Sequence, residues 1–391
     1  MIKCKKVSFK ANYDNINKLF QCNRLSAEVW NNALTIAKCY SLNNDGKWIN
    51  KIKLQTELKK IVPMHSQSIQ SVAHKYINAR DAAKKAKEVG CNTRYPWRKK
   101  KNFNTKWVDK AYTIYDNGKI ELSLGAKRSP IIIYVDKEIA KIKDSIKEIE
   151  LIYDRKLMLS ISYEDNKLIE ENNSSNICAI DPGEIHTVSA YAQNGNSIII
   201  TGRKMRSINR FRNKKLAELQ RKMSKCTKYS KQWKKYNRAK KYLLSKSEAQ
   251  LKDCLHKTTK EFINWCLENN IREVAIGNVE PKLNKKKKKS KGKKNNQKLS
   301  NWSVGKLRNY LAYKGKAKGM LVEKVDESYT SQQCPCCGRR KKSKDRNYHC
   351  KCSYSAHRDI HGARNILSKY INNGIITYIG DINNIKYVKI T

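Results

Sequence analysis

Two aspartates stand at positions where a protein could hold a divalent cation. Asp181 ends the apolar run 177–180 and precedes Pro182-Gly183, a pattern that predicts a buried strand stopping at a tight turn. Asp359 lies in the first turn of a helix whose apolar face begins at Ala363. Carboxylate oxygens are ligands that Mg²⁺ prefers. Both aspartates also have ordinary structural explanations, because such turns are common and negative charge stabilises a helix N-terminus. Neither aspartate alone therefore predicts a metal site.

Four cysteines near the C-terminus have the spacing of a zinc ribbon. Cys334 and Cys337 form a C-x-x-C pair, and Cys350 and Cys352 form a tighter C-x-C pair after a short basic loop. Four thiolates suit the tetrahedral coordination of one structural Zn²⁺, and the alternative ligands are Cys336 and His349. Most other members of the 13 cysteines are scattered singly, which is typical of a reducing, intracellular compartment.

The charge of the chain is strongly unbalanced. Its 391 residues include 84 Lys and Arg against 34 Asp and Glu, for a formal net charge of +50. Such a field favours a polyanionic partner, and phosphate backbones fit it best, with steeply salt-dependent binding. An anionic membrane is the weaker alternative, because no apolar stretch approaches the roughly 20 residues of a spanning helix and the N-terminus lacks a signal-peptide core. We therefore expect a cytoplasmic protein that binds nucleic acid and no membrane.

Two basic segments are candidates for contacting nucleic acid. The first is a loop that mixes aromatic rings with cations, typical of stacking on bases or gripping a backbone: Arg94, Tyr95, Trp97, Arg98 and Lys99. A domain linker packed by its own aromatic side chains explains this loop equally well. The second is a helical hairpin over 202–246, whose alternative explanation is a solvated charged surface. Its candidate contacts are Arg203, Lys204, Arg206, Arg210, Arg212, Lys214 and Lys215. The lysine-rich run 285–294 predicts a loop with non-specific phosphate contacts.

Periodicity and composition predict an α+β protein with several domains. Short alternating strands over 105–170, with 1–13 supplying a first strand, predict a β-barrel that is interrupted by a helical insertion over 14–104. A polar run then precedes a second domain, which we expect over 177–332 with the basic hairpin inside it. The zinc ribbon follows at 333–354 and the helix with Asp359 at 355–370. Residues 371–391 are expected to form either two short strands (375–379 and 385–390) or a tail.

Three motifs together resemble the TnpB family of transposon-encoded proteins and their compact type V CRISPR relatives. Asp181-Pro182-Gly183 after an apolar strand resembles the first motif of RuvC-type nucleases. The run from Tyr329 to Gly338 (YTSQQCPCCG) resembles the family's Thr-Ser-Gln…Cys-x-x-Cys-Gly signature. His357-Arg358-Asp359 with Asn365-Ile366-Leu367 resembles the third motif. The matches span about residues 177–370 in the family's order.

The resemblance implies an RNA-guided DNA endonuclease. The expected architecture is an N-terminal wedge β-barrel with a helical recognition insertion, followed by a RuvC/ribonuclease-H-like α/β nuclease domain with an inserted zinc ribbon. The implied cofactors are two Mg²⁺ ions, one structural Zn²⁺ and a guide RNA. The implied substrate is double-stranded target DNA beside a short flanking motif. One protein chain is expected to bind each guide RNA. The expected location is the cytoplasm of a prokaryote, at the nucleoid when the protein is bound to DNA.

One departure from the family concerns the second catalytic motif. The family ends an apolar strand with Glu, whereas here Glu273-Val274-Ala275-Ile276 is followed by Gly277. Some branches supply the glutamate just before the Tyr-Thr-Ser signature, where this chain has Glu327. The resemblance therefore implies Asp181, Glu327 and Asp359 as catalytic Mg²⁺ ligands, with Glu280 and Glu323 as alternatives to Glu327.

The alternative from another class is a nuclease-inactive, RNA-guided DNA-binding repressor. The presence of both Asp181 and Asp359 argues against it, because an inactive protein needs neither. A DNA-strand transposase is disfavoured, because nothing in the chain resembles tyrosine or serine recombinase machinery.

Overall fold

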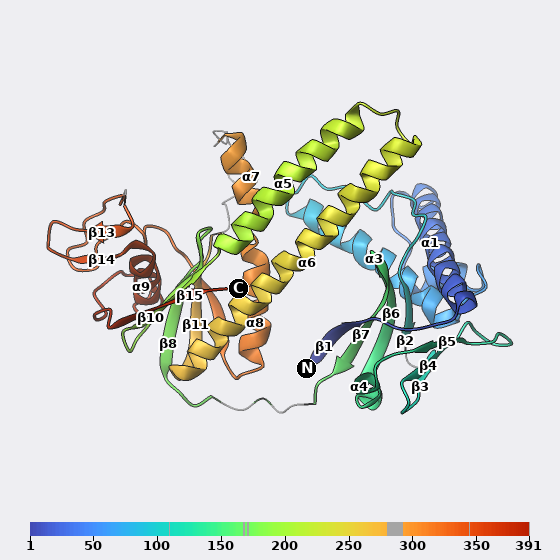
Figure 1. Cartoon of the computed structure of the whole chain (residues 1–391), viewed down its shortest axis with the longest axis horizontal. Coiled ribbons are helices and arrows are strands. Elements are labelled where there is room, and N and C mark those ends of the chain that lie inside the picture. Colours follow the sequence, from blue (N-terminus) through green and yellow to red (C-terminus); the bar gives the residue numbers. More distant parts are fainter. Residues whose placement is uncertain (109, 167–168, 170–171, 280–291, 344, 391) are drawn as a thin grey trace. The chain divides into compact units, whose positions relative to one another are not determined.

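The computed structural model describes residues 1–391 except 109, 167–168, 170–171, 280–291, 344 and 391 (Figure 1). The chain divides into two compact units, residues 1–167 and 168–391.

In unit 1, a helical segment lies along the chain between the first and the second strand. Its main helices are α1 (Tyr13–Leu42), α2 (Lys51–Glu57) and α3 (Ser66–Glu88). Asn12 and Asn50 cap the first two helices, since each side chain accepts a backbone N–H of the first turn. The three helices bury one apolar cluster around Trp30 and Tyr76. The break between α2 and α3 contains Pro63, which cannot continue a helix.

The strands of unit 1 form two antiparallel sheets. One sheet has the order β1 (Ile2–Val7), β7 (Lys156–Glu164), β6 (Ile146–Asp154), β2 (Thr105–Val108). The other consists of β3 (Tyr112–Ile114), β4 (Lys119–Leu122) and β5 (Ile131–Tyr134), followed by the short helix α4 (Lys137–Ala140) and a 3-10 turn at Lys143–Ser145. Both sheets contribute side chains to one hydrophobic cluster. The expected closed barrel stays a prediction.

Unit 2 is built on a six-stranded mixed sheet. Its order is β12 (Leu321–Val325), β11 (Ile271–Gly277), β8 (Asn176–Asp181), β9 (His186–Ala192), β10 (Asn196–Thr201), β15 (Asn384–Lys389). Strands β8, β9 and β10 are antiparallel neighbours, whereas β11 is parallel to β8, β12 to β11, and β15 to β10. The carboxyl ends of the parallel strands β8, β11 and β12 therefore meet at one edge of the sheet.

Helices cover both faces of this sheet (Figure 1). Cys178 and Ile180 of β8 pack in the same cluster as residues of α6 (Lys231–Glu268) and α8 (Val304–Lys316). The intervening Ala179 packs in a second cluster with α9 (Arg358–Ile371). This alternation is the period-2 geometry of a strand buried on both faces. The predicted mixed α/β character of this part of the chain is confirmed.

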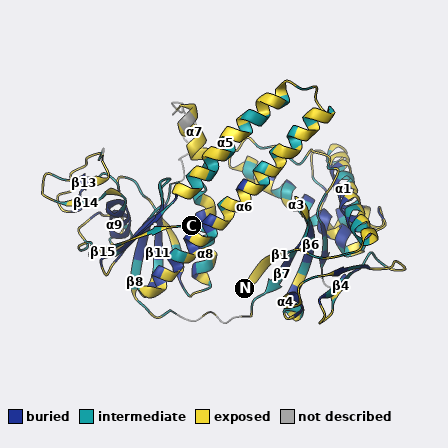
Figure 2. Cartoon of the chain, in the orientation of Figure 1, coloured by how far each residue is buried: buried dark blue, intermediate teal, exposed yellow. Residues whose placement is uncertain are grey.

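A long helical hairpin extends from the sheet. Its arms are α5 (Arg203–Ser224), which has no buried residue, and α6, whose buried residues begin only at Ser247 (Figure 2). The second arm of the hairpin continues without interruption into the part of α6 that packs on the sheet. A shorter helix, α7 (Lys293–Asn301), follows the undescribed segment 280–291, which holds most of the predicted lysine-rich run.

The cysteine-rich segment contributes the small hairpin β13 (Asn347–His349) and β14 (Ser355–His357), which leads directly into α9. The prediction of a strand at 375–379 is wrong. These residues are irregular, although Ile376 is buried and Ile379 packs beside α9. The second expected strand is β15. Among the described residues, no helix combines the length and apolar character needed to span a bilayer.

Candidate functional site

Asp181 lies at the last position of β8, where the central strand reaches the carboxyl edge of the sheet. The backbone N–H of Gly183 donates to the carbonyl oxygen of His186 (2.9 Å), which closes the turn into β9. Burial, together with the negative charges of Glu327 and Asp359, raises the pKa of the Asp181 carboxyl to about 7. Helix α9 also lies very close, because a Cβ on Gly362 would overlap the Asp181 carboxylate.

Glu327 follows β12 and reaches the same edge. A Cβ added to Gly277, at the end of β11, would lie 3.0 Å from Oε2 of Glu327. The Glu327 carboxylate thus occupies space beside the position where the family's glutamate would begin. Burial, and then the charge of Asp326, raise the pKa of Glu327.

The loop carrying Glu327 is fixed by α9. Asn365, which is fully buried, donates from Nδ2 to the carbonyl oxygens of Thr330 and Gln333 (2.8 Å each). The N–H and hydroxyl of Thr330 in turn donate to the carbonyl oxygen of Glu327 (3.2 and 2.8 Å). Tyr329, which directly precedes Thr330, has a φ of 66°, a left-handed conformation that a tight turn imposes.

Asp359 stands in the first turn of α9. Its Oδ2 lies 2.5 Å from Nδ1 of His186 and 3.9 Å from Nη1 of Arg346. These two partners engage one carboxylate oxygen, and neither contacts Oδ1 in the described structure.

Glu327 and Asp359 thus both lie close enough to Asp181 for their charges to raise its pKa. Two of the three predicted Mg²⁺ ligands are carboxyls with raised pKa values, so the protein leaves much of their negative charge uncompensated. A set of oxygen ligands with excess negative charge fits a hard divalent cation. Of the alternatives, Glu323 lies on β12 and accepts from the Tyr370 hydroxyl (2.9 Å), whereas Glu280 lies outside the described residues.

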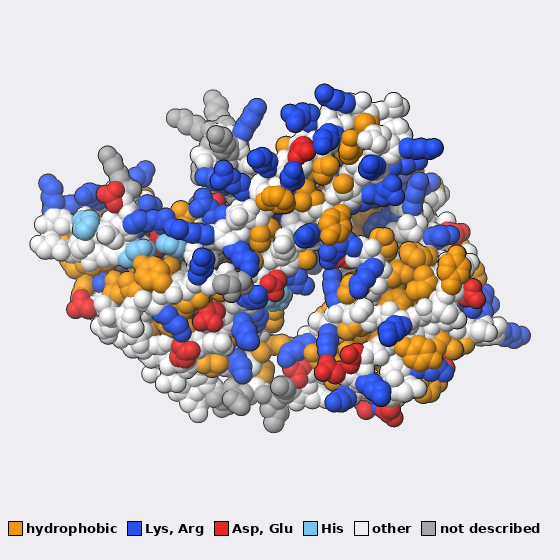
Figure 3. Space-filling view, in the orientation of Figure 1, with side chains coloured by type: hydrophobic (Ala, Val, Ile, Leu, Met, Phe, Trp, Pro, Cys, Tyr) orange, Lys and Arg blue, Asp and Glu red, His pale blue; other side chains and the backbone are white. Residues whose placement is uncertain are grey.

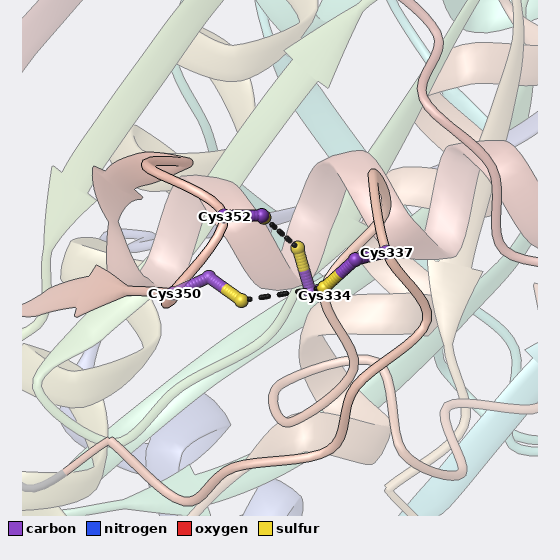
Figure 4. Close-up of side chains that lie close together, drawn as sticks. All are labelled: Cys334, Cys337, Cys350 and Cys352. Atoms are coloured by element: carbon purple, nitrogen blue, oxygen red, sulfur yellow. Dashed lines mark hydrogen bonds between the residues drawn. The ribbon is translucent and has the colours of Figure 1, made fainter.

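The four predicted zinc ligands converge (Figure 4). Sγ of Cys334 lies 3.5 Å from that of Cys352, and Sγ of Cys337 lies 3.5 Å from that of Cys350. Thiolates around one Zn²⁺ are about 3.8 Å apart, given Zn–S bonds of ~2.3 Å and tetrahedral angles. The cluster therefore fits zinc. It does not include Cys336 or His349; the latter instead lies 2.9 Å from the Ser355 hydroxyl.

The predicted basic residues of α5 border a groove that begins at the Asp181 turn. This cavity of about 910 Å³ is lined by Gly183 and Glu184 of the turn, by α5, α6 and α8, and by Trp302. Four of the predicted contacts line it: Arg203, Arg206, Arg210 and Lys214. Figure 3 shows Lys and Arg side chains over the hairpin of α5 and α6.

Three other predicted contacts on α5 are arranged differently. Lys204 and Lys215 are exposed, and Lys215 pairs with Glu218 (3.1 Å). Arg212 donates from Nη2 to Asn301 (2.7 Å). The positions of these three residues fit both a nucleic-acid contact and a solvated surface.

The aromatic loop of unit 1 combines the two explanations given for it. Tyr95 packs on Trp48, with ring centroids 4.8 Å apart, as a structural linker would. Trp97 is 62% exposed with Arg98 beside it, and Arg94 and Lys99 are exposed. Trp97 is therefore the aromatic ring of this loop that is available for stacking.

Sequence reasoning missed His186 and Arg346, which both approach Asp359. The signal for His186 was its position five residues after Asp181, just across the turn. It becomes informative only when the register of β8 and β9 is known.

Unit 2 is a mixed α/β domain that has carboxylates near one edge of its sheet and a four-cysteine cluster. Two family models match parts of the chain. The family described as "Probable transposase" matches residues 160–282, and the "Cas12f1-like, TNB domain" family matches residues 305–366.

The predicted resemblance to the TnpB family is confirmed by related proteins. "TnpB-like protein MJ0751" of Methanocaldococcus jannaschii is 30% identical over 179 residues, which cover 44% of this chain and 60% of that protein. "Putative RNA-guided DNA endonuclease InsQ" of Escherichia coli is 33% identical over 168 residues, covering 40% of this chain and 41% of that protein. The matched segments thus span about half the length of these relatives.

The fold of the chain resembles that of a solved type V effector. The cryo-EM structure of a Cas12f1–sgRNA–target DNA complex aligns with a TM-score of 0.67, covering 91% of this chain and 83% of that one, at 17% sequence identity.

Proposed function

We propose that the chain is an RNA-guided DNA endonuclease whose cutting site is formed by Asp181, Glu327 and Asp359. The observation that carries the proposal is the Glu327 carboxylate beside Gly277, because it supplies the third acid where the second motif lacks one. The strand order of unit 2, three antiparallel strands followed by two parallel ones, supports a ribonuclease-H-like domain. The named activity of the InsQ relative supports RNA guidance.

The three carboxylates would hold the Mg²⁺ ions. When bound, these ions supply an activated water and stabilise the leaving oxygen of the scissile phosphodiester. The chain itself positions the ligands. Strand β8 fixes Asp181, Asn365 fixes the Glu327 loop, and His186 with Arg346 engages Oδ2 of Asp359.

The groove beside α5 is the proposed path for the nucleic-acid backbone. Its cations lie along one wall that starts at Gly183, two residues after Asp181, so a strand held there would pass the carboxylates. Base pairing between a guide RNA and the target would supply sequence specificity, while the protein recognises duplex shape and a short flanking motif. The proposed complex has one chain per RNA and a zinc ribbon that is structural.

The first experiment identifies the RNA. The protein is expressed with its native flanking DNA, and the co-purifying RNA is sequenced. A single species with a constant scaffold and a variable end supports guidance, whereas heterogeneous RNA without a common scaffold contradicts it.

The second experiment exchanges the glutamate between its two positions. With the guide bound, Mg²⁺-dependent cleavage of a supercoiled target plasmid is expected to be lost in Glu327→Ala and partly restored in Glu327→Ala with Gly277→Glu. In the double variant the Cβ of the restored glutamate would lie 2.9 Å from the end of the Ile366 side chain, which can move, and 3.5 Å from the carbonyl oxygen of Ile180. Gly277→Glu alone should impair cleavage, since its Cβ would crowd the Glu327 carboxylate.

The matched control is Glu323→Ala, which removes a carboxylate from β12 close to Glu327 in sequence. Cleavage that survives Glu327→Ala and fails in Glu323→Ala would move the third ligand to Glu323. Guided DNA binding without cleavage by the unmodified protein would instead identify the repressor.

A further inference from the structure

A second group of metal-binding side chains lies around Asp359. His186, at the start of β9, and His357, at the end of β14, flank this carboxylate. One ligand atom from each of the three residues lies within 4.8 Å of the other two. The two imidazole rings have centroids 5.9 Å apart, and Nδ1 of His186 is 2.5 Å from Oδ2 of Asp359.

The backbone around this triad is well fixed. The carbonyl oxygen of His186 accepts the N–H of Gly183 (2.9 Å), and the N–H of Arg358 donates to the carbonyl oxygen of Arg346 (2.8 Å). The ring of His357 packs edge-on against Tyr387 of β15. The ligands therefore come from elements that the sheet and α9 already hold in place.

The bonding of His357 is unusual for a histidine kept for packing. Its Nδ1 atom is buried and has no hydrogen-bond partner among the residues that the structure describes. Buried ring nitrogens are normally paired, so an orphaned one indicates a missing partner.

We propose that His186, His357 and Asp359 bind a divalent transition-metal ion such as Co²⁺, Ni²⁺ or Zn²⁺, at a site separate from the proposed Mg²⁺ ligands but sharing Asp359. Two imidazoles and one carboxylate suit these ions, whereas Mg²⁺ prefers oxygen ligands. Ligands at ~2.0–2.2 Å from one ion in tetrahedral geometry are about 3.3–3.6 Å apart. The triad reaches this spacing by side-chain rotation, with His186 and Asp359 moving slightly apart.

The neighbouring cation does not block the site. Arg346 lies 3.9 Å from Asp359, but its side chain is 52% exposed and can turn toward solvent when an ion binds. Binding of the ion does not depend on the proposed function. Its consequence does, because an ion in the triad would withdraw Asp359 from the Mg²⁺ ligands and oppose cleavage.

The test is a Co²⁺ titration of the full chain with its cysteine cluster already loaded with Zn²⁺, followed by calorimetry and by visible absorption. The unmodified chain should bind one equivalent without a sulfur-to-cobalt charge-transfer band. His357→Ala and His186→Ala should each weaken binding by at least about tenfold. Two variants lie on different strands, so one misfolded variant leaves the other informative; circular dichroism checks both.

Two control variants separate the triad from other sites. His74→Ala, in unit 1, should leave Co²⁺ affinity unchanged, and Asp181→Asn, in the proposed Mg²⁺ site, should lower it less than either triad histidine variant does. Affinity lost in Asp181→Asn but retained in both triad histidine variants would place the ion on the carboxylates, which overturns this inference while supporting the proposed function. Absence of any equivalent beyond the zinc cluster would also overturn it.

Discussion

Replacing Asp181 by Asn should stabilise the Mg²⁺-free protein at pH 8. The structure holds this carboxyl against Glu327 and Asp359, and its pKa rises from 3.8 to about 7. The Asn side chain has nearly the same shape and no charge at any pH. The variant therefore removes the repulsion while keeping the packing against Gly362.

The size of the effect follows from the two pKa values. Below pH 3.8 Asp181 is protonated in both the folded and unfolded chain, so its ionisation does not affect stability. As the pH rises from 3.8 to 7, the unfolded chain ionises and the folded one does not, and the free energy of unfolding falls by about 1.4 kcal/mol per pH unit. The loss levels off above pH 7 at about 4 kcal/mol. Because Asp181 is only half-buried, water screens part of the repulsion, and we expect about 2–4 kcal/mol.

The assay is thermal unfolding in Mg²⁺-free buffer without a chelator, which would strip zinc from the cysteine cluster. For a domain of this size about 1 kcal/mol changes Tm by ~2–4 °C, so Asp181→Asn should raise Tm by roughly 4–16 °C at pH 8. At pH 5 the gain should be less than half as large. Added Mg²⁺ should raise the Tm of the unmodified chain more than that of the variant.

Asp326→Asn is the matched control, because it removes a neighbouring carboxylate in the opposite situation. Hydrogen bonding from Ser328, and then Lys369, lowers the pKa of Asp326, so its charge stabilises the fold above pH 3.8. This variant should lose stability at both pH values. A fall in Tm for Asp181→Asn at pH 8 would refute the clustering of carboxylates on which the site rests.

Three further outcomes are expected. Gly362→Ala should lower both Tm and plasmid cleavage, because the new Cβ would overlap the Asp181 carboxylate. Arg210→Ala and Lys214→Ala should each weaken nucleic-acid binding about equally for all sequences and reduce the salt slope by about 1, measured by fluorescence anisotropy at several ionic strengths. Tyr348 of the ribbon stacks on His361 of α9 with ring centroids 4.0 Å apart. Because zinc would hold the ribbon in the shape that allows this contact, removing zinc should release the ribbon from α9. Faster amide hydrogen exchange at the start of α9 would report the release, and unchanged exchange would contradict it.

Local sequence patterns predicted most elements that surround the site. The apolar run before Asp181 and the helix after Asp359 appear where periodicity predicted them, because each segment buries the face that its own apolar side chains form. The cysteine spacing likewise predicted the cluster, since a short loop brings the two pairs together.

What sequence could not supply is the pairing of distant segments. The strand β15 lies almost 190 residues after its partner β10, and nothing in Asn384–Lys389 indicates which edge it joins. The apolar residues over 375–379 resemble a strand, yet they pair with none of the described strands and pack as single side chains. His186 became visible as a neighbour of Asp359 only through the contact between β9 and α9, which are 173 residues apart at this point.

The position of β15 has a consequence for biosynthesis. Strand β10 offers its outer edge from the moment residues 196–201 leave the ribosome, but its parallel partner is made last among the strands of unit 2. At ~5–20 residues per second, that edge stays open for roughly 10–40 seconds. An open strand edge favours wrong pairing with other chains. The basic hairpin, which precedes β15 by more than 100 residues, opposes such pairing during this interval, because nascent chains that carry the same charge repel one another.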